Sequence, residues 1–254
     1  MLKLFFIRHT ESIGNRAGRM MGRGDDALSD RGRDQARSLG LALHRAGGWP
    51  DWIYSSPQRR ATETAELARQ AIATMDEMGG IKMDGINGID RPVPRSIPDI
   101  VTDANLCEFD NGILQGLTWP EAQRQYPDLC QALEQSWDWI PIPQAETLED
   151  GRSRAQAFLQ GLIDRHQAQE QIWVISHHWM LQQLLAEALG SLRTWQLSIA
   201  HGAVFELWLD RSHWQTTDQL ATSLGDRRRL NHIFWQIRRF NQVLETMDKV
   251  SLDR

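Results

Sequence analysis

Short apolar runs along this chain alternate with longer segments in which apolar residues recur every three or four positions. The runs at 2–7, 51–56, 172–176 and 202–209 have the length and content of buried strands. The longer spacing predicts helices from about 29 to 46, from 57 to 68, over 119–137 and 147–168, and from 180 to 189. Strands that alternate with helices are typical of a largely parallel sheet covered on both faces. We therefore expect an α/β fold with three layers, α/β/α, around a mostly parallel central sheet.

Residues with special backbone preferences mark the ends of several predicted helices. Ser29 is a suitable N-cap for the first long helix, which Gly47 and Gly48 end. Pro57 suits the first turn of the next helix. Gly190 follows the last predicted helix and is expected to end it.

Residues 76–105 do not follow this alternation. Glycines and prolines recur throughout the segment, at positions 79, 80, 85, 88, 92, 94 and 98, and they exclude a long regular element. The segment lies between two motifs that are expected to face the functional site. We therefore expect a loop-rich insertion that covers the site.

The tail also differs from the rest of the chain. Apolar residues recur there with spacings of three and four, namely Leu230, Ile233, Ile237, Phe240, Leu244 and Met247. That spacing predicts an extra C-terminal helix with an a/d stripe. We divide the chain into a domain over 1–210, with its insertion at about 76–105, and a helical extension over 211–254. The stripe either packs on its own domain or forms a subunit contact, in which case the protein is a homodimer.

Composition limits the functional classes. The chain has 254 residues and a formal net charge of -5, which does not favour nucleic acid or an anionic membrane as a partner. An anionic substrate must therefore be held by a local group of cations. The apolar start is too short for a signal-peptide core, and no run approaches the roughly 20 residues of a membrane span. Cys107 and Cys130 suit a reduced, cytoplasmic protein.

Arg8 and His9 directly follow the first apolar run. In an open α/β sheet, ligands bind beyond the carboxyl ends of the strands. Imidazole can attack phosphorus, and a guanidinium can hold phosphate oxygens in a bidentate fork. Alone, the dipeptide is equally compatible with a surface ion pair. The rest of the chain favours the chemical interpretation.

Four segments carry that interpretation, each beside a predicted strand or helix. They are Arg8-His9-Thr10-Glu11-Ser12-Ile13-Gly14-Asn15, later followed by Leu28-Ser29-Asp30-Arg31-Gly32-Arg33-Asp34-Gln35-Ala36; Ser55-Ser56-Pro57-Gln58-Arg59-Arg60-Ala61-Thr62-Glu63-Thr64-Ala65; Leu106-Cys107-Glu108-Phe109-Asp110-Asn111-Gly112-Ile113-Leu114-Gln115-Gly116-Leu117-Thr118; and Val174-Ile175-Ser176-His177-His178. In this order they resemble the histidine phosphatase superfamily, also called the phosphoglycerate-mutase-like family. The resemblance covers most of residues 2–209.

The resemblance implies a role for each catalytic candidate. His9 is expected to be the nucleophile that becomes phosphohistidine. Arg8, Arg60 and His177 are expected to bind the phosphoryl oxygens. Glu108 is expected to protonate the leaving oxygen and then to activate water.

Further residues are candidates for substrate binding. Asn15 matches a phosphate contact of the family, and Ser12 lies in the same loop. Thr10 and His178 stand where the family carries glycine or small residues, so they add bulk beside the phosphate. His201, just before the last predicted strand, is a candidate for the mouth of the pocket.

Elementary chemistry agrees with these roles. Phosphoryl transfer needs an in-line nucleophile and positive charge around three equatorial oxygens, and two guanidiniums and an imidazole supply that charge. The histidine nucleophile must be neutral, and cations beside it lower its pKa and favour that form. No metal or cofactor is required, and no histidine–carboxylate spacing typical of metal ligands stands out. Of the adjacent Arg59 and Arg60, the spacing to Thr64 and Ala65 favours Arg60, and Arg59 is expected to be solvated.

Within the family, the sequence favours hydrolysis of a small phosphate ester. Cofactor-dependent mutases carry a longer, basic insert after the glutamate motif, whereas residues 116–145 here contain one basic residue, Arg124. A mutase stays the alternative. A catalytically silent phosphate-binding module is a second alternative, although the complete set of catalytic candidates argues against it.

Overall fold

The computed structural model describes residues 1–79, 96–190, 194–210 and 235–244. Its centre is a six-stranded sheet with the order β3-β2-β4-β1-β5-β6. The strands are β1 (Leu2–Arg8), β2 (Trp52–Ser55), β3 (Ile100–Thr102), β4 (Gln171–Ser176), β5 (Ala203–Leu209) and β6 (Trp235–Val243). β1 to β4 pair in parallel, whereas β5 and β6 add an antiparallel edge. The expected α/β fold with a largely parallel core is confirmed, and β5 differs from the parallel strand that the alternation predicts.

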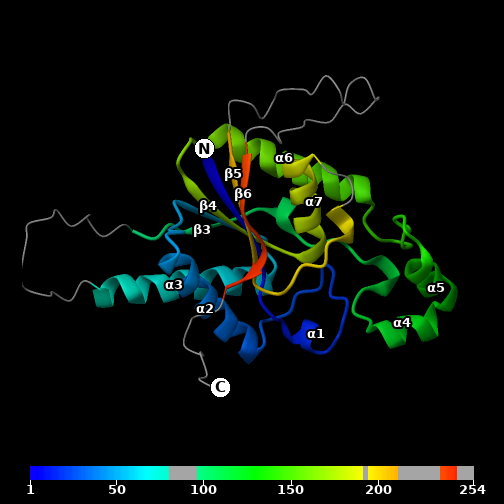
Figure 1. Cartoon of the computed structure of the whole chain (residues 1–254). Coiled ribbons are helices and arrows are strands. Elements are labelled where there is room, and N and C mark those ends of the chain that lie inside the picture. Colours follow the sequence, from blue (N-terminus) through cyan, green and yellow to red (C-terminus); the bar gives the residue numbers. More distant parts are fainter. Residues whose placement is uncertain (80–95, 191–193, 211–234, 245–254) are drawn as a thin grey trace, which may run out of the picture.

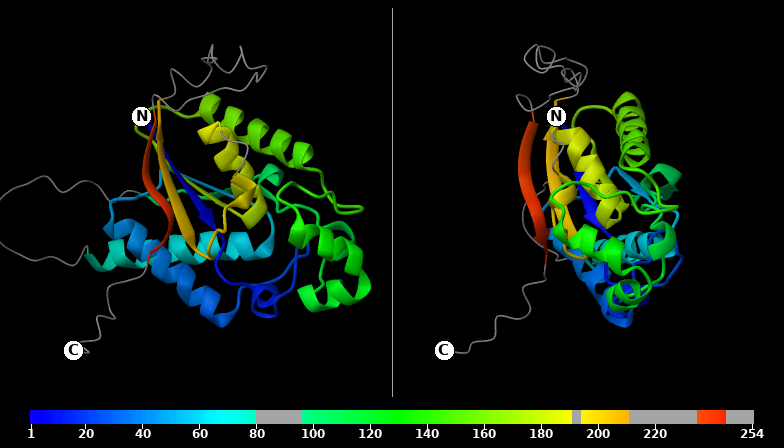
Figure 2. Two further views of the ribbon diagram at one scale, coloured as in Figure 1. Left: turned by 45° about the vertical axis from the view of Figure 1, so that its right-hand side comes forward. Right: turned by 90° about the vertical axis from the view of Figure 1, so that its right-hand side faces the viewer.

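Helices cover both faces of this sheet (Figures 1 and 2). One face is covered by α2 (Asp30–Arg45) and α3 (Arg59–Gly79), and the other by α6 (Leu148–Arg165) and α7 (His178–Leu189). The helices α1 (Ile13–Arg16), α4 (Trp119–Gln125) and α5 (Pro127–Gln135) lie to one side of the sheet. One core contains Phe5 and Ile7 of β1 together with apolar residues of α2 and α3. The other contains Leu4 and Phe6 with apolar residues of α6 and α7. Successive side chains of a strand point to opposite faces, so β1 contributes to both cores and the fold has three layers.

The capping residues act as the sequence predicts. The Ser29 hydroxyl accepts the N–H of Gly32 at the start of α2, and Gly190 ends α7 in the left-handed conformation, with φ 64°. The helix predicted over 119–137 is two helices, because Tyr126, directly before Pro127, has an extended φ of -137°. Proline disfavours the helical conformation in the residue before it, so the chain bends there.

The bounds predicted for the loop-rich insertion, 76–105, are too wide at both ends. α3 continues to Gly79, and β3 at 100–102 pairs with β2 inside the sheet. β3 contains Ile, Val and Thr, which favour an extended strand. Residues 80–95, the centre of the predicted insertion, lie outside the described residues.

The prediction of an extra C-terminal helix is wrong for the described part of the tail. Residues 235–243 form β6, which pairs antiparallel with β5 from Leu209↔Trp235 to Ala203↔Val243. The register shifts between Val204 and Glu206 and again between Glu206 and Leu207. Each extra residue in a bulged strand reverses the side of the sheet that the following side chains face. Apolar residues three apart, such as Ile237 and Phe240, therefore fit a bulged strand as well as a helix. Leu230, Ile233 and Met247 lie outside the described residues.

The predicted subunit contact depends on the C-terminal helix, which the described part of the tail does not form. The homodimer is predicted from a long apolar stripe on one helix. In the described part of the tail, the residues of that stripe lie on a strand of the central sheet. The boundary at residue 210 lies between β5 and β6, two paired strands. The homodimer stays a prediction without that support.

Candidate active site

The carboxyl ends of three adjacent parallel strands carry the residues that the motifs single out. β1, β2 and β4 end at Arg8, Ser55 and Ser176, and the chain continues with His9, Ser56 and His177. Backbone hydrogen bonds extend the sheet by one residue, from His9 N–H to Ser176 O at 2.9 Å and from Ser56 N–H to Ile175 O at 3.0 Å. The rings of His9 and His177 consequently lie 5.0 Å apart. A parallel sheet thus joins motifs that are far apart in the sequence.

His9 has the geometry of a nucleophile. Its side chain is 2% exposed, and its Nδ1 lies 2.7 Å from the carbonyl oxygen of Thr10. A carbonyl oxygen can only accept, so Nδ1 carries the hydrogen and Nε2 of the neutral ring is left with its lone pair. Burial lowers the pKa of His9 well below its ordinary value, and His177, Arg60 and Arg8 lower it further. The ring is therefore neutral at physiological pH.

Two guanidiniums supply positive charge beside this ring. Arg60, 2% exposed, donates to Gly24 O at 2.7 Å, to Gly22 O at 2.8 Å and to Asp26 Oδ1 at 3.0 Å. Arg8 donates to the carbonyl oxygen of Ile199. Burial lowers the pKa of Arg8 to about 10, so it stays charged at neutral pH. These carbonyls and the carboxylate hold the two planar groups in fixed orientations.

Arg59 and Arg60 lie in different surroundings, one exposed and one buried, as the sequence predicts. The Arg59 side chain is 59% exposed and pairs with Glu63 one turn along α3. Arg60, the next residue, points into the buried side of the helix. The prediction that Arg60 is the inward arginine is confirmed.

His177 lies beneath His9 and is fully buried. Its Nε2 is 2.8 Å from the hydroxyl oxygen of Ser56, and no protein partner faces its Nδ1 among the described residues. Burial lowers its pKa well below the ordinary value, followed by the effects of Arg60, Arg8 and Arg154. A buried imidazole nitrogen without a protein partner is suited to a polar ligand.

Glu108 is held at the amino-terminal end of α7. Its Oε1 accepts the N–H groups of Phe109, Trp179 and Met180 at 3.0, 3.1 and 3.2 Å. Its Oε2 makes a single longer contact, 3.3 Å from Trp179 N. The backbone N–H of Glu108 donates to Gln58 Oε1 at 2.7 Å. One carboxylate oxygen is thus anchored, and the other is available to a ligand.

A cavity of about 320 Å³ joins these groups. Its lining includes four of the five catalytic candidates, namely Arg8, His9, Arg60 and Glu108, and two of the substrate-binding candidates, Asn15 and His178. Asn15 is the third residue of α1, where it forms a capping box with Ser12. Arg19, Asn111 and Ser198 add further polar side chains to the wall, and the rest of its side-chain surface is apolar, from Met20, Met21, Trp179 and Ile199. The size suits a phosphoryl group and a small part of the molecule that carries it.

Thr10 and Ser12 do not line this cavity. Both side chains are buried within the fold, where the Thr10 hydroxyl donates to Gly32 O at 2.8 Å and the Ser12 hydroxyl accepts the N–H of Asn15 at 3.1 Å. A threonine after the nucleophile therefore ties the loop to α2 and does not crowd the phosphate. We correct the expectation that these two residues contact substrate, because their hydroxyls already serve the local structure.

His178 and His201 lie at the edge of the site. His178 lines the cavity, and the His201 ring is 6.0 Å from that of His9. The pKa of each is lowered to about 4, mainly by burial and then by the charge of Arg8. His201 thus lies near His9, but it does not line the cavity.

Several positioning residues escape sequence reasoning. Asp26 binds Arg60, Gln58 connects Glu108 to the carbonyl of Gly22 at 3.0 Å, and Arg154 holds the chain before Glu108 through Asn105 O and Cys107 O. Gln58 lies beside the arginine motif, which is the one available signal. Asp26 and Arg154 are ordinary charged residues in the sequence, and only the folded chain brings them to the site.

The described residues form neither a metal cluster nor a disulfide. Among the residues that the structure describes, no three histidine, cysteine, aspartate or glutamate side chains are grouped to hold a metal ion. Cys107 and Cys130 are both unpaired. No helix in the described ranges is long and apolar enough to cross a membrane.

Known proteins resemble this chain in sequence and fold. It is 30% identical to phosphoserine phosphatase 1 of Hydrogenobacter thermophilus, over 75% of this chain and 77% of that protein. It is 26% identical to phosphoglycerate mutase-like protein 4 of Arabidopsis thaliana, over 75% and 73%. The solved structure of Bacillus stearothermophilus YhfR is similar with a TM-score of 0.65 and 27% identity, over 83% of this chain and 92% of that one. The alpha-ribazole phosphatase of Shigella flexneri has the same fold with a TM-score of 0.67.

The family assignment rests on the match of a family model. The model of the histidine phosphatase superfamily, branch 1, matches residues 4–91 and 93–220. This range contains the four motifs and the strand ends that carry them. The chain belongs to the histidine phosphatase superfamily (branch 1).

Proposed function

We propose that this protein is a metal-independent phosphomonoesterase that hydrolyses a small phosphorylated molecule through a phosphohistidine at His9. One observation carries the proposal. The hydrogen bond from His9 Nδ1 to Thr10 O fixes the tautomer in which Nε2 is the nucleophile, beside the buried Arg60 and the partly buried Arg8. A merely structural histidine would gain nothing from cations that disfavour its protonation.

The first step transfers the phosphoryl group to the protein. His9 Nε2 forms the bond to phosphorus while the bond from phosphorus to the ester oxygen breaks. Glu108, protonated for this step, gives its proton to that oxygen, and the alcohol leaves. Arg8 and Arg60 neutralise the charge on the equatorial oxygens. His177 Nδ1, which faces no protein partner in the described chain, is suited to a phosphoryl oxygen.

The second step returns His9 to its starting state. Glu108, now a carboxylate, takes a proton from water as the water oxygen attacks phosphorus. The bond from phosphorus to Nε2 breaks, its electron pair returns to the ring, and inorganic phosphate leaves. No redox change occurs and no metal is needed, because the protein supplies the charge and the proton transfers.

Turnover of p-nitrophenyl phosphate in excess EDTA tests the proposal. We expect hydrolysis by the wild type and an acid-labile, base-stable phosphoryl adduct after rapid quench. His9→Ala should abolish both, because alanine removes the Nε2 that forms the bond to phosphorus. His44→Ala, on α2 outside the cavity, is the matched control and should retain turnover. Equal turnover by His9→Ala and wild type would overturn the mechanism.

The alternatives predict different products. A mutase moves the phosphoryl group to a second hydroxyl and releases little inorganic phosphate. A silent binding module binds phosphate without turnover. The segment after Glu108 supports hydrolysis, because Arg124 is its one basic residue through position 145, and the side chain of Arg124 does not line the cavity. Phosphate release measured against alcohol release separates the three.

A further inference from the structure

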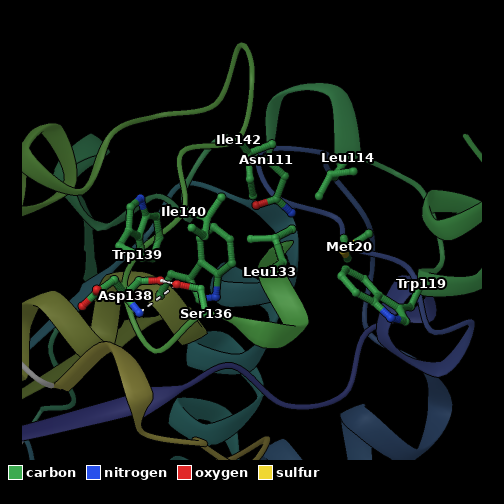
Figure 3. Close-up of a pocket in the computed structure, with 11 residues that line it drawn as sticks. Met20, Asn111, Leu114, Trp119, Leu133, Ser136, Asp138, Trp139, Ile140 and Ile142 are labelled. Carbon is green, nitrogen blue, oxygen red and sulfur yellow. Dashed lines mark hydrogen bonds between the residues drawn. The ribbon is translucent and has the colours of Figure 1, made fainter. Parts of the chain in front are cut away.

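A second cavity, of about 270 Å³, adjoins the phosphate cavity. Its wall comes from the region of α4 and α5, from the segment after α5, and from α7. The lining residues are Met20, Asn111, Leu114, Trp119, Leu133, Ser136, Asp138, Trp139, Ile140, Ile142 and Trp179. Figure 3 shows Trp119 and Trp139 on opposite sides of the space, with Leu133 and Asn111 between them. The space is thus bounded mainly by apolar and aromatic side chains.

The two cavities share a wall. Met20, Asn111 and Trp179 line both of them. The backbone N–H of Trp179 also binds Glu108, at 3.1 Å. The indole of Trp179 lies 5.3 Å from that of Trp139 and 5.7 Å from the ring of Phe109, so this wall is rigidly packed. The proposed proton donor therefore lies at the border between the phosphate cavity and the apolar one.

The charge of the second cavity limits what it can hold. Among its lining residues, Asp138 is the single charged one, and it is exposed at the rim. Ser136 accepts the N–H of Asp138 at 3.0 Å, which occupies its hydroxyl locally. No cation faces this space among the lining residues. A substrate carboxylate or second phosphate would be desolvated there without a partner, which is unfavourable.

We propose that this apolar cavity binds the alcohol portion of the substrate, and that this portion is uncharged and carries an aromatic ring or a bulky branched apolar group. The inference rests on the proposed hydrolysis, because it places the leaving oxygen at Glu108. His9 attacks from one side of phosphorus, and the leaving group departs on the opposite side. The protonated oxygen then lies at the shared wall, and the rest of the alcohol extends between Trp119 and Trp139.

The preference for substrates tests this assignment. We expect kcat/KM for 1-naphthylmethyl phosphate, an alkyl ester like the two compounds compared with it, to exceed that for phosphoserine and for 3-phosphoglycerate by at least about tenfold, on the scale of a filled apolar pocket. Glycerol 2-phosphate serves as the reference substrate, because its alcohol portion is compact and uncharged. A protein that hydrolyses phosphoserine or 3-phosphoglycerate best would overturn the inference and leave the hydrolysis standing.

Variants of the cavity wall test whether the substrate preference arises in this cavity. In Trp119→Ala, the ratio of kcat/KM between 1-naphthylmethyl phosphate and glycerol 2-phosphate, both alkyl esters, should fall about tenfold, because one aromatic wall is removed. Trp137→Ala is the matched control, since Trp137 is 83% exposed and does not line the cavity. Leu133→Ala provides a second wall variant if Trp119→Ala fails to fold. An unchanged ratio in both wall variants would contradict the assignment.

A binding measurement separates this inference from the catalytic proposal. Titration of 1-naphthylmethylphosphonate and methylphosphonate into wild type and His9→Ala by calorimetry needs no turnover. We expect the naphthyl compound to bind at least about tenfold more tightly in both proteins, and Trp119→Ala to remove most of that difference. Tighter binding without any hydrolysis would support the cavity and refute the catalytic proposal. Equal binding of the two phosphonates would refute the cavity assignment.

Discussion

Arg60 and Asp26 form a buried ion pair, 3.0 Å from Nη1 to Oδ1, whose side chains are 2% and 10% exposed. The second carboxylate oxygen of Asp26 accepts the N–H of Gly14 at 2.8 Å. One aspartate thus joins Arg60 on α3 to α1, the short helix that contains Gly14 and Asn15. Because both Arg60 and Asn15 line the phosphate cavity, Asp26 sets their spacing without touching the ligand itself.

Asp26→Asn should weaken phosphate binding. The amide keeps the size of the side chain but loses the charge, and it can no longer serve both Arg60 and Gly14 as a carboxylate does. We predict that the inhibition constant of inorganic phosphate rises about tenfold, while the free energy of unfolding falls by about 1.5–3 kcal/mol, the scale of a hydrogen bond to a charged group. Inhibition kinetics and urea titration measure the two effects.

Asp30→Asn is the control for this variant. Its carboxylate is 95% exposed and pairs with Arg33 on the surface of α2. Surface pairs contribute about 0–1 kcal/mol, so phosphate affinity and stability should change little. If Asp26→Asn lost stability with unchanged affinity for phosphate, Asp26 would be structural and would not position Arg60.

Glu108→Gln should separate proton donation from the structural role of this side chain. The amide oxygen can replace Oε1 and accept the N–H groups of Trp179 and Met180, so the start of α7 is retained. The amide cannot donate as a carboxylic acid does. Alkyl phosphates should therefore lose roughly 100-fold or more in single-turnover phosphorylation. p-Nitrophenyl phosphate, whose leaving group is a weak base, should lose much less.

The ratio of these two losses is the decisive measurement. An acid that assists departure of the alcohol affects poor leaving groups most. A merely structural change affects both esters alike. Equal losses in the two single-turnover experiments, with an unchanged melting temperature, would remove Glu108 from the role of general acid.

Much of the catalytic centre is predictable from the sequence because of sheet topology. Arg8 and His177 follow apolar runs, and parallel strands place their carboxyl ends at one edge. The spacing from Arg60 to Thr64 and Ala65 favours Arg60 over Arg59, and Arg60 lies on the buried side of α3. These inferences need only local periodicity and a rule of connectivity, and the structure brings their residues together as expected.

The remaining features depend on contacts that local patterns do not encode. The tail is ambiguous because bulges in β6 give an apolar spacing that a helix also shows. Asp25 and Asp26 are adjacent and identical in type, yet the first accepts the N–H of Arg59 and the second binds the Arg60 side chain. The apolar cavity arises where α4, α5 and α7 meet, so no single motif announces it.

Buried histidines should make the protein sensitive to acid. The pKa values of His9 and His177 lie well below 6.5, and those of His178 and His201 fall to about 4, with burial the largest cause for all. Above pH 6.5 both the folded and unfolded states hold these rings neutral, so stability does not depend on them. Between pH 6.5 and 4 the unfolded state binds protons that the folded state does not. The free energy of unfolding should therefore fall as the pH falls through this window.

His201→Gln tests the sign and the size of this effect. A single histidine contributes at most about 1.4 kcal/mol per pH unit. Between pH 6 and 5 we predict that the variant loses less stability than the wild type, by up to that amount, in urea titrations at fixed ionic strength. At pH 7.5 the proton-linked difference should vanish. Parallel stability curves for the two proteins across pH 7.5, 6 and 5 would contradict the assignment.

Asn241 on β6 should influence phosphate binding although it lies outside the cavity. Its amide donates to Ser198 O at 2.8 Å and accepts the N–H of Ala200 at 3.2 Å, and these two residues flank Ile199, whose carbonyl holds Arg8. We predict that Asn241→Gly, which keeps the left-handed φ of 51° and loses both bonds, raises the inhibition constant of phosphate a few-fold, by loosening Arg8. Gln242→Ala, on the exposed neighbour, should leave it unchanged. Asn241 lies on a strand that pairs with β5 and is far from His9 in the sequence. An effect of its substitution on phosphate affinity must therefore pass through residues 198–200. Unaltered phosphate inhibition in Asn241→Gly, with reduced stability alone, would show that β6 supports the sheet without positioning Arg8.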